Sequence, residues 1–195
     1  MSISTGWWPA AFGLLAAALG AVPGFAESMA PAERIALCGA CHGEDGNSRM
    51  PNVPSLAGQP EFFVLNQLFL MREGVRRIEP MIPLVKDLKD DDLNALSKHF
   101  AALAPKPSGE PIEEALVRRG AELAQAKRCG SCHLPGLTGQ DQMPRLAKQR
   151  VDYLVYALTA IRDGKRSGAD TLMSQSVAGL SDTELAALAH YAASR

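Results

Sequence analysis

The sequence predicts an all-α protein built from two tandem domains that are related by internal duplication. Segments of the first half recur in the second half in the same order, and each half contains a set of helical patterns. A proline- and glycine-rich stretch separates the two halves, and no period-2 pattern of a β-strand is found. The predicted parts are an N-terminal signal peptide at 1–26, a first domain at 27–104, a linker at 105–111 and a second domain at 112–195.

The duplication is clearest around a pentapeptide that contains two cysteines and a histidine. The pentapeptide CGACH at 38–42 recurs as CGSCH at 129–133, an offset of 91 residues. The segment LAGQ at 56–59 recurs as LAKQ at 146–149, an offset of 90. Offsets that drift by one or two residues indicate small loop changes within a duplicated domain. The further matched pairs are Phe63 and Tyr153, Leu68 and Leu158, Arg72 and Arg162, Gly74 and Gly164, Arg76 and Arg166, Met81 and Met173, and Leu88 and Leu180.

Each half is predicted to contain an opening helix, a middle helix and an amphipathic closing helix. Asp90 is the predicted N-cap of the first closing helix. Ser181, with Glu184 three residues later, fits the capping-box pattern at the second closing helix. The predicted helices are Pro31–Leu37, Glu61–Glu73, Asp90–Leu103, Ile112–Ala126, Val151–Asp163 and Ser181–Ser194.

Composition and charge indicate an exported globular protein without a nucleic-acid partner. The chain has 195 residues and a formal net charge of −1, so it lacks the basic excess of a nucleic-acid-binding protein. Residues 1–26 contain no Asp, Glu, Lys or Arg, and their apolar run ends in small residues that suit cleavage after Ala26. The missing basic region leaves an uncleaved membrane anchor as the alternative, although the run is short for a bilayer span of roughly 20 residues.

The repeated pentapeptide predicts two covalently attached haem c groups. Two cysteines three residues apart lie close together on one helical face, so each thiol can add to one vinyl group of a single porphyrin. The next residue, a histidine, then supplies the proximal nitrogen to the iron. A redox-active dithiol would belong in a βαβ context, and one zinc site of four cysteines would leave both histidines unexplained. Disulfides between the halves are a third alternative.

Met81 and Met173 are the predicted sixth ligands of the two haem irons. Met81 lies 39 residues after His42, Met173 lies 40 residues after His133, and both precede a leucine by seven residues. A methionine sulfur opposite histidine raises the reduction potential of an electron-carrying haem. Two alternatives stay open, namely methionine as core filler and His99 as a ligand. The chain has no symmetric pair of spare histidines that would replace both methionines.

Two prolines and four arginines recur around the predicted haem sites. Pro54 follows His42 by 12 residues, and Pro144 follows His133 by 11. A rigid proline loop suits the presentation of a backbone carbonyl to the second ring nitrogen of the proximal histidine, with a plain turn as the alternative. The recurring arginines are predicted either to bind haem propionates or to lie at helix ends, and they are Arg72, Arg76, Arg162 and Arg166.

The chain resembles the dihaem cytochrome c4 family, whose members consist of two class I cytochrome c domains, each wrapped around one covalently bound haem. The resemblance covers about residues 31–195. It rests on CGACHG at 38–43, PSLAGQ at 54–59, RxGxR at 72–76, Met81 and the leucine-rich closing helix, most of which the second half repeats. The resemblance implies periplasmic electron transfer, often to a membrane terminal oxidase.

The resemblance also implies the ligands of each haem. The second half departs from the pattern at Leu134, which replaces the glycine after the motif histidine, and in a loop before Met173 that is two residues longer. These departures point to a specialised relative as a further possibility. The implied residues are Cys38, Cys41, His42 and Met81 for haem one, and Cys129, Cys132, His133 and Met173 for haem two.

Two functions of an electron carrier are compatible with these motifs. The first is a shuttle between a respiratory donor and an acceptor such as a terminal oxidase. The alternative is a dedicated electron-accepting cytochrome subunit of a periplasmic dehydrogenase complex. An enzyme is not expected, because catalysis at iron needs an open coordination position and a methionine is predicted at both irons. The expected partners are redox proteins, such as a membrane cytochrome complex, with only peripheral membrane contact if the signal peptide is cleaved.

The two halves differ in charge. Residues 27–104 carry 8 basic and 11 acidic side chains, whereas residues 105–195 carry 12 basic and 10 acidic ones. Ends of opposite sign would attract different partners, with an uneven solvated surface as the alternative. The basic residues that crowd the second pentapeptide are Lys127, Arg128, Arg145, Lys148 and Arg150.

Overall fold

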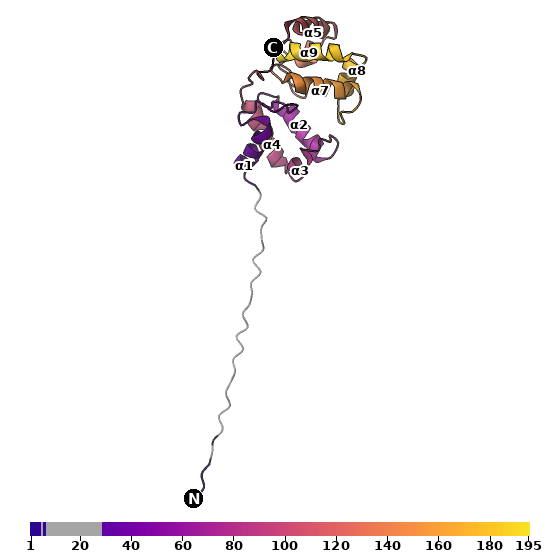
Figure 1. The fold of residues 1–195 in the computed structure, drawn as a ribbon. Helices are drawn as coiled ribbons and strands as arrows, with labels where there is room; N and C mark the ends of the chain where they lie inside the picture. The colour runs from indigo at the N-terminus through magenta and orange to yellow at the C-terminus, as the bar shows by residue number, and fades with distance from the viewer. Residues whose placement is uncertain (5, 7–28) are drawn as a thin grey trace.

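The computed structural model describes residues 1–4, 6 and 29–195 of the chain. Figure 1 shows two helical domains, with α1–α4 in the first and α5–α9 in the second. No strand forms within the described residues, as predicted, and none of their helices combines the length and apolar character that a membrane span requires. The predicted cleavage after Ala26 falls in the segment 7–28, which lies outside the described residues, so the signal peptide stays a prediction.

The first domain is organised around the packing of its middle helix against its closing helix. Leu93, Leu96 and Phe100 recur at helical spacing and form the buried face of the closing helix. The opening helix continues past the predicted end at Leu37, through both cysteines, to His42. The helices of this domain are α1 (Pro31–His42), α2 (Glu61–Arg72), α3 (Ile82–Val85) and α4 (Asp90–Ala102).

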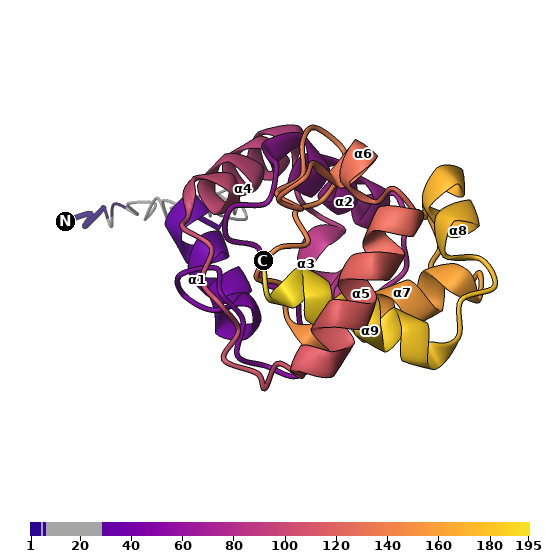
Figure 2. The same cartoon turned by 90° about the horizontal axis from the view of Figure 1, so that it is seen from above.

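The second domain repeats this arrangement with a different opening. Its opening helix ends before the pentapeptide, because Arg128 adopts a left-handed φ of 55°, and the chain becomes helical again only at Gly130. The opening and closing helices cross closely at Gly120 (Figure 2). The helices are α5 (Glu114–Ala126), α6 (Gly130–His133), α7 (Val151–Arg162), α8 (Thr171–Val177) and α9 (Asp182–Ala193).

The short helices α3, α6 and α8 were not predicted from the sequence. Each is too short for a 3.6-residue period to be recognised. The loop before α8 is the one that is longer in the second half, and it contributes Asp170 as the N-cap of this helix. The Asp170 carboxylate accepts hydrogen bonds from the amides of Leu172 (2.8 Å) and Met173 (3.2 Å). The longer loop therefore positions the start of α8, where Met173 lies.

The two closing helices begin differently. Lys89 occupies the N-cap position of α4, so the prediction that Asp90 is the N-cap is wrong, and Asp90 is the first helical residue. The capping box at α9 is confirmed, since Ser181 Oγ accepts from the Glu184 amide at 3.3 Å and Glu184 Oε2 accepts from the Ser181 amide at 2.9 Å.

A recurring arginine joins the middle helix to the closing helix in both domains. Arg72 Nη1 donates to the carbonyl of Leu88 (3.1 Å) and to Asp90 Oδ1 (2.7 Å). Arg162 makes the same two bonds, at 3.0 and 2.6 Å, to the residues 92 positions further along the chain. Of the two roles predicted for these arginines, the structure shows the one at a helix end. Because the aspartates are exposed, the ion pairs themselves contribute little stability.

Candidate functional site

The two cysteine pairs lie at the ends of helices, with one thiol of each pair half-buried and the other exposed. Cys38 and Cys41 lie on α1, and Cys129 and Cys132 lie at and just beyond the start of α6. Burial raises the pKa of the Cys38 and Cys129 thiols. All four cysteines are free, so no disulfide joins the halves. Among residues 29–195, no three His, Cys, Asp or Glu side chains are grouped so that they could hold a metal ion.

Each motif histidine is buried and oriented by the carbonyl of the recurring proline. His42 Nδ1 lies 2.8 Å from the Pro54 oxygen, and His133 Nδ1 lies 2.8 Å from the Pro144 oxygen. A carbonyl only accepts hydrogen bonds, so Nδ1 must carry the proton and Nε2 keeps its lone pair. Burial lowers the pKa of both histidines, which favours the neutral imidazole that binds iron. The predicted role of these two prolines is confirmed.

The loops that follow the motif histidines have similar backbone geometry despite a change of residue. Gly43 has a φ of 87°, and Leu134 stands at the matching position with a φ of 66°. A Cβ on Gly43 would overlap the carbonyl oxygen of Asn47, so the first loop requires glycine at this position. The second loop accommodates a leucine with a ψ of 158°, a backbone conformation that costs a non-glycine residue about 1–3 kcal/mol. The departure at Leu134 therefore leaves the direction of the chain unchanged.

Met81 and Met173 occupy corresponding places in the two domains. Met81 immediately precedes α3, and Met173 is the third residue of α8. Both side chains are partly buried. Met81 packs against the apolar core that also contacts Cys38, and Met173 packs against the core that also contacts Cys129. Each thioether therefore lies on the same apolar cluster as the first cysteine of its own motif.

Arg76 presents an unpartnered donor at the boundary between the domains. Its side chain is buried, its Nη1 donates to Gln67 Oε1 at 2.5 Å, and its Nε has no partner among the described residues. Burial raises the pKa of Tyr153 in the other domain, but the positive charges of Arg166 and Arg76 outweigh burial and leave this pKa below its usual value. An unpaired buried N–H is costly, and a haem propionate would satisfy it.

The two histidines outside the motifs have local structural contacts. His190 is buried in α9, and its Nδ1 accepts a hydrogen bond from the Glu113 amide at 3.2 Å. The ring of His99 packs edge-on against Phe100, with a centroid distance of 5.1 Å. His190 thus joins the closing helix to the start of the second domain.

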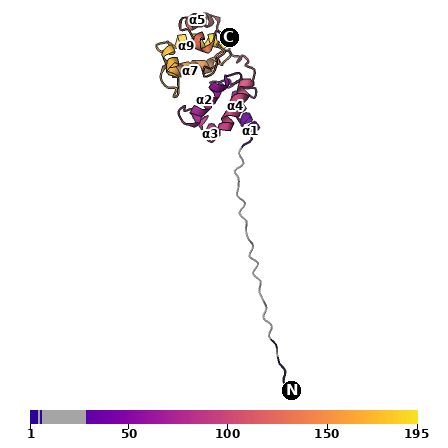
Figure 3. The same ribbon diagram turned by 180° about the vertical axis from the view of Figure 1, so that it is seen from behind.

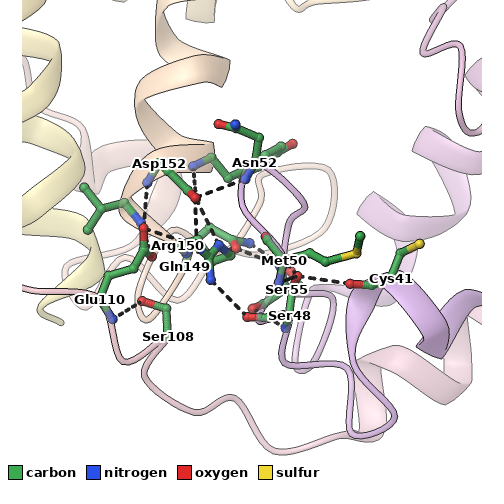
Figure 4. Close-up of polar contacts among 12 residues, drawn as sticks. Cys41, Ser48, Met50, Asn52, Ser55, Ser108, Glu110, Gln149, Arg150 and Asp152 are labelled. Atoms are coloured by element: carbon green, nitrogen blue, oxygen red, sulfur yellow. Dashed lines mark hydrogen bonds and ion pairs between the residues drawn. The ribbon is translucent and has the colours of Figure 1, made fainter.

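The domain interface contains polar residues whose role was not predicted from the sequence. Gln59 and Gln149 end the repeated segments LAGQ and LAKQ, and both are almost fully buried. Each amide side chain makes two hydrogen bonds to the backbone of the other domain, Gln59 to Arg145 and Gln149 to Ser55, at 2.8–3.0 Å. Figure 4 shows the contact of Gln149 with Ser55. The repeat was visible in the sequence, but only the fold shows that both copies meet.

Part of the basic cluster near the second pentapeptide is buried in this interface. The guanidinium of Arg145 donates to the carbonyls of Ala57 (2.6 Å) and Gly58 (3.2 Å) in the first domain. Burial lowers its pKa to about 10, which keeps it charged at neutral pH. Arg150 pairs with Asp152 at 2.7 Å and lies near Glu110 of the linker at 3.5 Å (Figure 4). Neither arginine is therefore available to dock a partner.

Replacement of Arg145 with methionine is expected to weaken the attachment of the two domains. The change removes charge-assisted hydrogen bonds and leaves buried carbonyls of Ala57 and Gly58 unpaired, at a cost of about 2–3 kcal/mol. We expect a lower melting temperature and faster proteolysis within residues 105–111. Lys148→Met, on the same loop, is the control. Equal thermal stability and proteolysis of the Arg145→Met variant and the unsubstituted protein would contradict this role.

These features define a c-type cytochrome. Each of the two helical domains has a Cys-x-x-Cys-His motif, and the histidine of each motif is buried with its Nε2 free to bind iron. The residues present fit haem, since each domain offers two thiols, an oriented neutral imidazole and a thioether on an apolar cluster. Arg76 adds an unpaired donor for a propionate. Bound haem supplies an iron that changes its oxidation state by one electron.

Comparisons with known proteins agree with this class. Residues 117–194 match the family model of cytochrome c. Cytochrome c4 of Pseudomonas aeruginosa is 36% identical over 167 residues, which cover 81% of this chain and 83% of that protein. The crystal structure of reduced recombinant cytochrome c4 from Pseudomonas stutzeri superposes with a TM-score of 0.76 at 32% identity, over 83% of this chain and 94% of that one. A thiosulfate dehydrogenase electron acceptor of Thiomonas intermedia is 32% identical over 182 residues, or 85% of this chain and 81% of that protein.

The chain belongs to the cytochrome c4 family. Its two domains have the class I cytochrome c fold, and its cofactors are two covalently attached haem c groups. The protein is a c-type cytochrome that carries electrons.

Proposed function

We propose that this protein is a periplasmic electron carrier with two six-coordinate haems and no catalytic activity of its own. His42 and Met81 would bind the first iron, and His133 and Met173 the second. The observation that carries this proposal is the matched placement of an oriented imidazole and a thioether in each domain. With both axial positions filled, neither iron has an open position for a substrate.

The proposal includes the division of the chain and its location. The first domain extends over 27–104, the linker over 105–111 and the second domain over 112–195, after export and cleavage at Ala26. The linker is held in place, because Glu110 accepts hydrogen bonds from the amides of Val151 (2.8 Å) and Asp152 (3.1 Å) at the start of α7. A close, polar domain interface supports passage of an electron from one domain to the other, between a respiratory donor and an acceptor such as a terminal oxidase.

The absorption spectrum of the ferric holoprotein tests this coordination. The weak far-red band of methionine sulfur bound to ferric haem is recorded, and its intensity is divided by the amount of haem. Full intensity for two haems is the expected result. Intensity for one haem, together with high-spin features, would overturn the proposal and would direct attention to ligand binding or catalysis at the other haem.

A dedicated cytochrome subunit of a dehydrogenase is the second candidate. It is favoured by the similarity to a thiosulfate dehydrogenase electron acceptor and by an apolar face on α2. Phe62 and Phe69, seven residues apart on this helix, are exposed, whereas Asp152 and Thr159 stand at the matching positions of α7. Exposed aromatic side chains on one helix face suit contact with a protein partner.

Reduction by a partner enzyme separates the two candidates. The oxidised cytochrome is mixed with a purified thiosulfate dehydrogenase and thiosulfate, and its reduction is followed by absorbance. Rapid reduction with a stable complex on size-exclusion chromatography would support the dedicated subunit. Slow reduction without a complex would support a general carrier.

A further inference from the structure

A single peptide group connects the proximal histidine of the first domain to a glutamine of the second. The carbonyl of Pro54 accepts the hydrogen bond from His42 Nδ1 at 2.8 Å. The N–H of the same peptide group belongs to Ser55, and it donates to Gln149 Oε1 at 2.8 Å. The path therefore runs from an imidazole through one amide plane to a side chain of the other domain (Figure 4 shows the contact of Ser55 with Gln149).

The same connection exists in the opposite direction. The carbonyl of Pro144 accepts from His133 Nδ1 at 2.8 Å, and the N–H of Arg145, in the same peptide group, donates to Gln59 Oε1 at 3.0 Å. Both histidines are thus linked crosswise to the neighbouring domain. The front and back views in Figures 1 and 3 place α2 beside α7 at this domain boundary, and each glutamine lies just before one of these helices.

The orientation of both glutamine amides is determined by their second hydrogen bond. Gln59 Nε2 donates to the Arg145 carbonyl at 2.9 Å, and Gln149 Nε2 donates to the Ser55 carbonyl at 2.8 Å. Only the nitrogen of the amide can donate and only its oxygen can accept, so each Oε1 must face the peptide N–H. All four residues are at least 95% buried, so water does not compete for these bonds.

We propose that Gln59 and Gln149 are positioning residues that tune the haem of the other domain. An acceptor at the N–H of a peptide polarises its carbonyl, because hydrogen bonds in a chain strengthen one another by about 10–30% each. The carbonyl then accepts a stronger hydrogen bond from Nδ1–H, which increases the electron density on the imidazole and makes it a better electron donor to iron. A more donating ligand favours the ferric state, so each glutamine lowers the reduction potential of the haem it does not touch.

The tuning depends on the proposed coordination of iron by His42 and His133. Gln59→Met and Gln149→Met remove the acceptor while nearly preserving the side-chain volume. The potential of each haem in the holoprotein is measured by a redox titration followed by NMR, with the haems assigned through contacts to their own motif residues. We expect Gln59→Met to raise the potential of haem two, and Gln149→Met that of haem one. The expected size is up to tenfold in the equilibrium constant of reduction, or about 59 mV for one electron.

The control removes a different hydrogen bond across the interface. Ser167→Ala deletes the hydroxyl that accepts a hydrogen bond from the Arg77 amide at 3.1 Å. This bond involves neither of the loops that contain Pro54 and Pro144, so the reduction potentials of both haems should stay unchanged. The proposal would be overturned by any of three results in the glutamine variants. These are a change in potential confined to the haem of the substituted domain, an equal change in both haems, or no change in either. Failure of histidine–methionine coordination would be visible separately, as a missing far-red band in the unsubstituted protein.

A measurement on the unsubstituted protein covers the case in which a variant does not fold. In the reduced protein, scalar couplings through hydrogen bonds are recorded from the Arg145 amide nitrogen to the Gln59 side-chain carbonyl, and from Ser55 to Gln149. Detection of both couplings would support the crosswise connection. Their absence, with the haems normally coordinated, would overturn it.

Discussion

Replacement of Met173 with alanine is expected to remove half of the far-red band of the ferric protein and to make one haem high-spin. Alanine has no donor atom, so the second iron would lose its sulfur ligand and its potential would fall. Met81→Ala should have the same effect on the first haem, and the double variant should lose the band entirely. Absorption spectra and a potentiometric titration, each with haem quantified, measure these changes.

Met50→Ala provides the matched control, because Met50 is exposed and has no counterpart in the duplication. It should leave the band and both potentials unchanged. A Met173→Ala variant with an intact band would show that another residue binds the second iron. That outcome would contradict the coordination proposed for this domain, where the loop before the methionine is longer.

Replacement of Gly120 with valine is expected to destabilise the second domain by about 3 kcal/mol, the upper end of the usual cost of overpacking. A Cβ at Gly120 would overlap the carbonyl oxygen of Ala187 and would lie 2.7 Å from the Cβ of Tyr191. The obstructing atoms are the Ala187 backbone and the Cβ of Tyr191, both on α9, and neither can move aside by a side-chain rotation, so α5 and α9 would have to separate. Unfolding in guanidinium chloride, followed by circular dichroism, measures the loss.

Ala115→Val is the control for this change, since Ala115 is exposed on the same helix and the substitution adds the same β-branch. Only the small cost of helix propensity is expected there. If the free energy of unfolding of Gly120→Val equals that of Ala115→Val, the prediction is wrong and α5 and α9 can accommodate a side chain at this crossing. The first domain has no such glycine, because the position 91 residues earlier is Met29, which precedes α1.

Much of the haem site could be predicted because its chemistry is encoded over short distances along the chain. Two cysteines three residues apart and an adjacent histidine need only one or two helical turns to become a site. The hydrogen bond from His42 to Pro54 spans 12 residues within one loop, and the matching pair in the second half confirmed the pattern. The long helices were also predictable, since their apolar residues repeat with the helical period.

The short helices and the domain interface could not be predicted in this way. A helix of four residues contains too little of a period to be recognised. The left-handed φ of Arg128, which separates α5 from α6, is likewise not required by its residue type. Arg145 and Arg150 were grouped with exposed basic residues because charge is usually solvated. Their burial depends on carbonyls and carboxylates that the fold brings to them.

The amino-acid sequence was sufficient for the duplication, the helical class and the haem motifs, because each depends on local spacing or on repetition. It suggested the proximal hydrogen bonds, and the fold decided them against a plain turn. The tertiary structure alone decided how the copies meet. Gln59 and Gln149 bond to residues 86 and 94 positions away, and nothing in their own segments indicates a partner at that distance. Such bonds form only when two folded domains place their loops side by side. The orientation of each glutamine side chain then follows from the free-energy cost of leaving a buried amide without a hydrogen-bond partner.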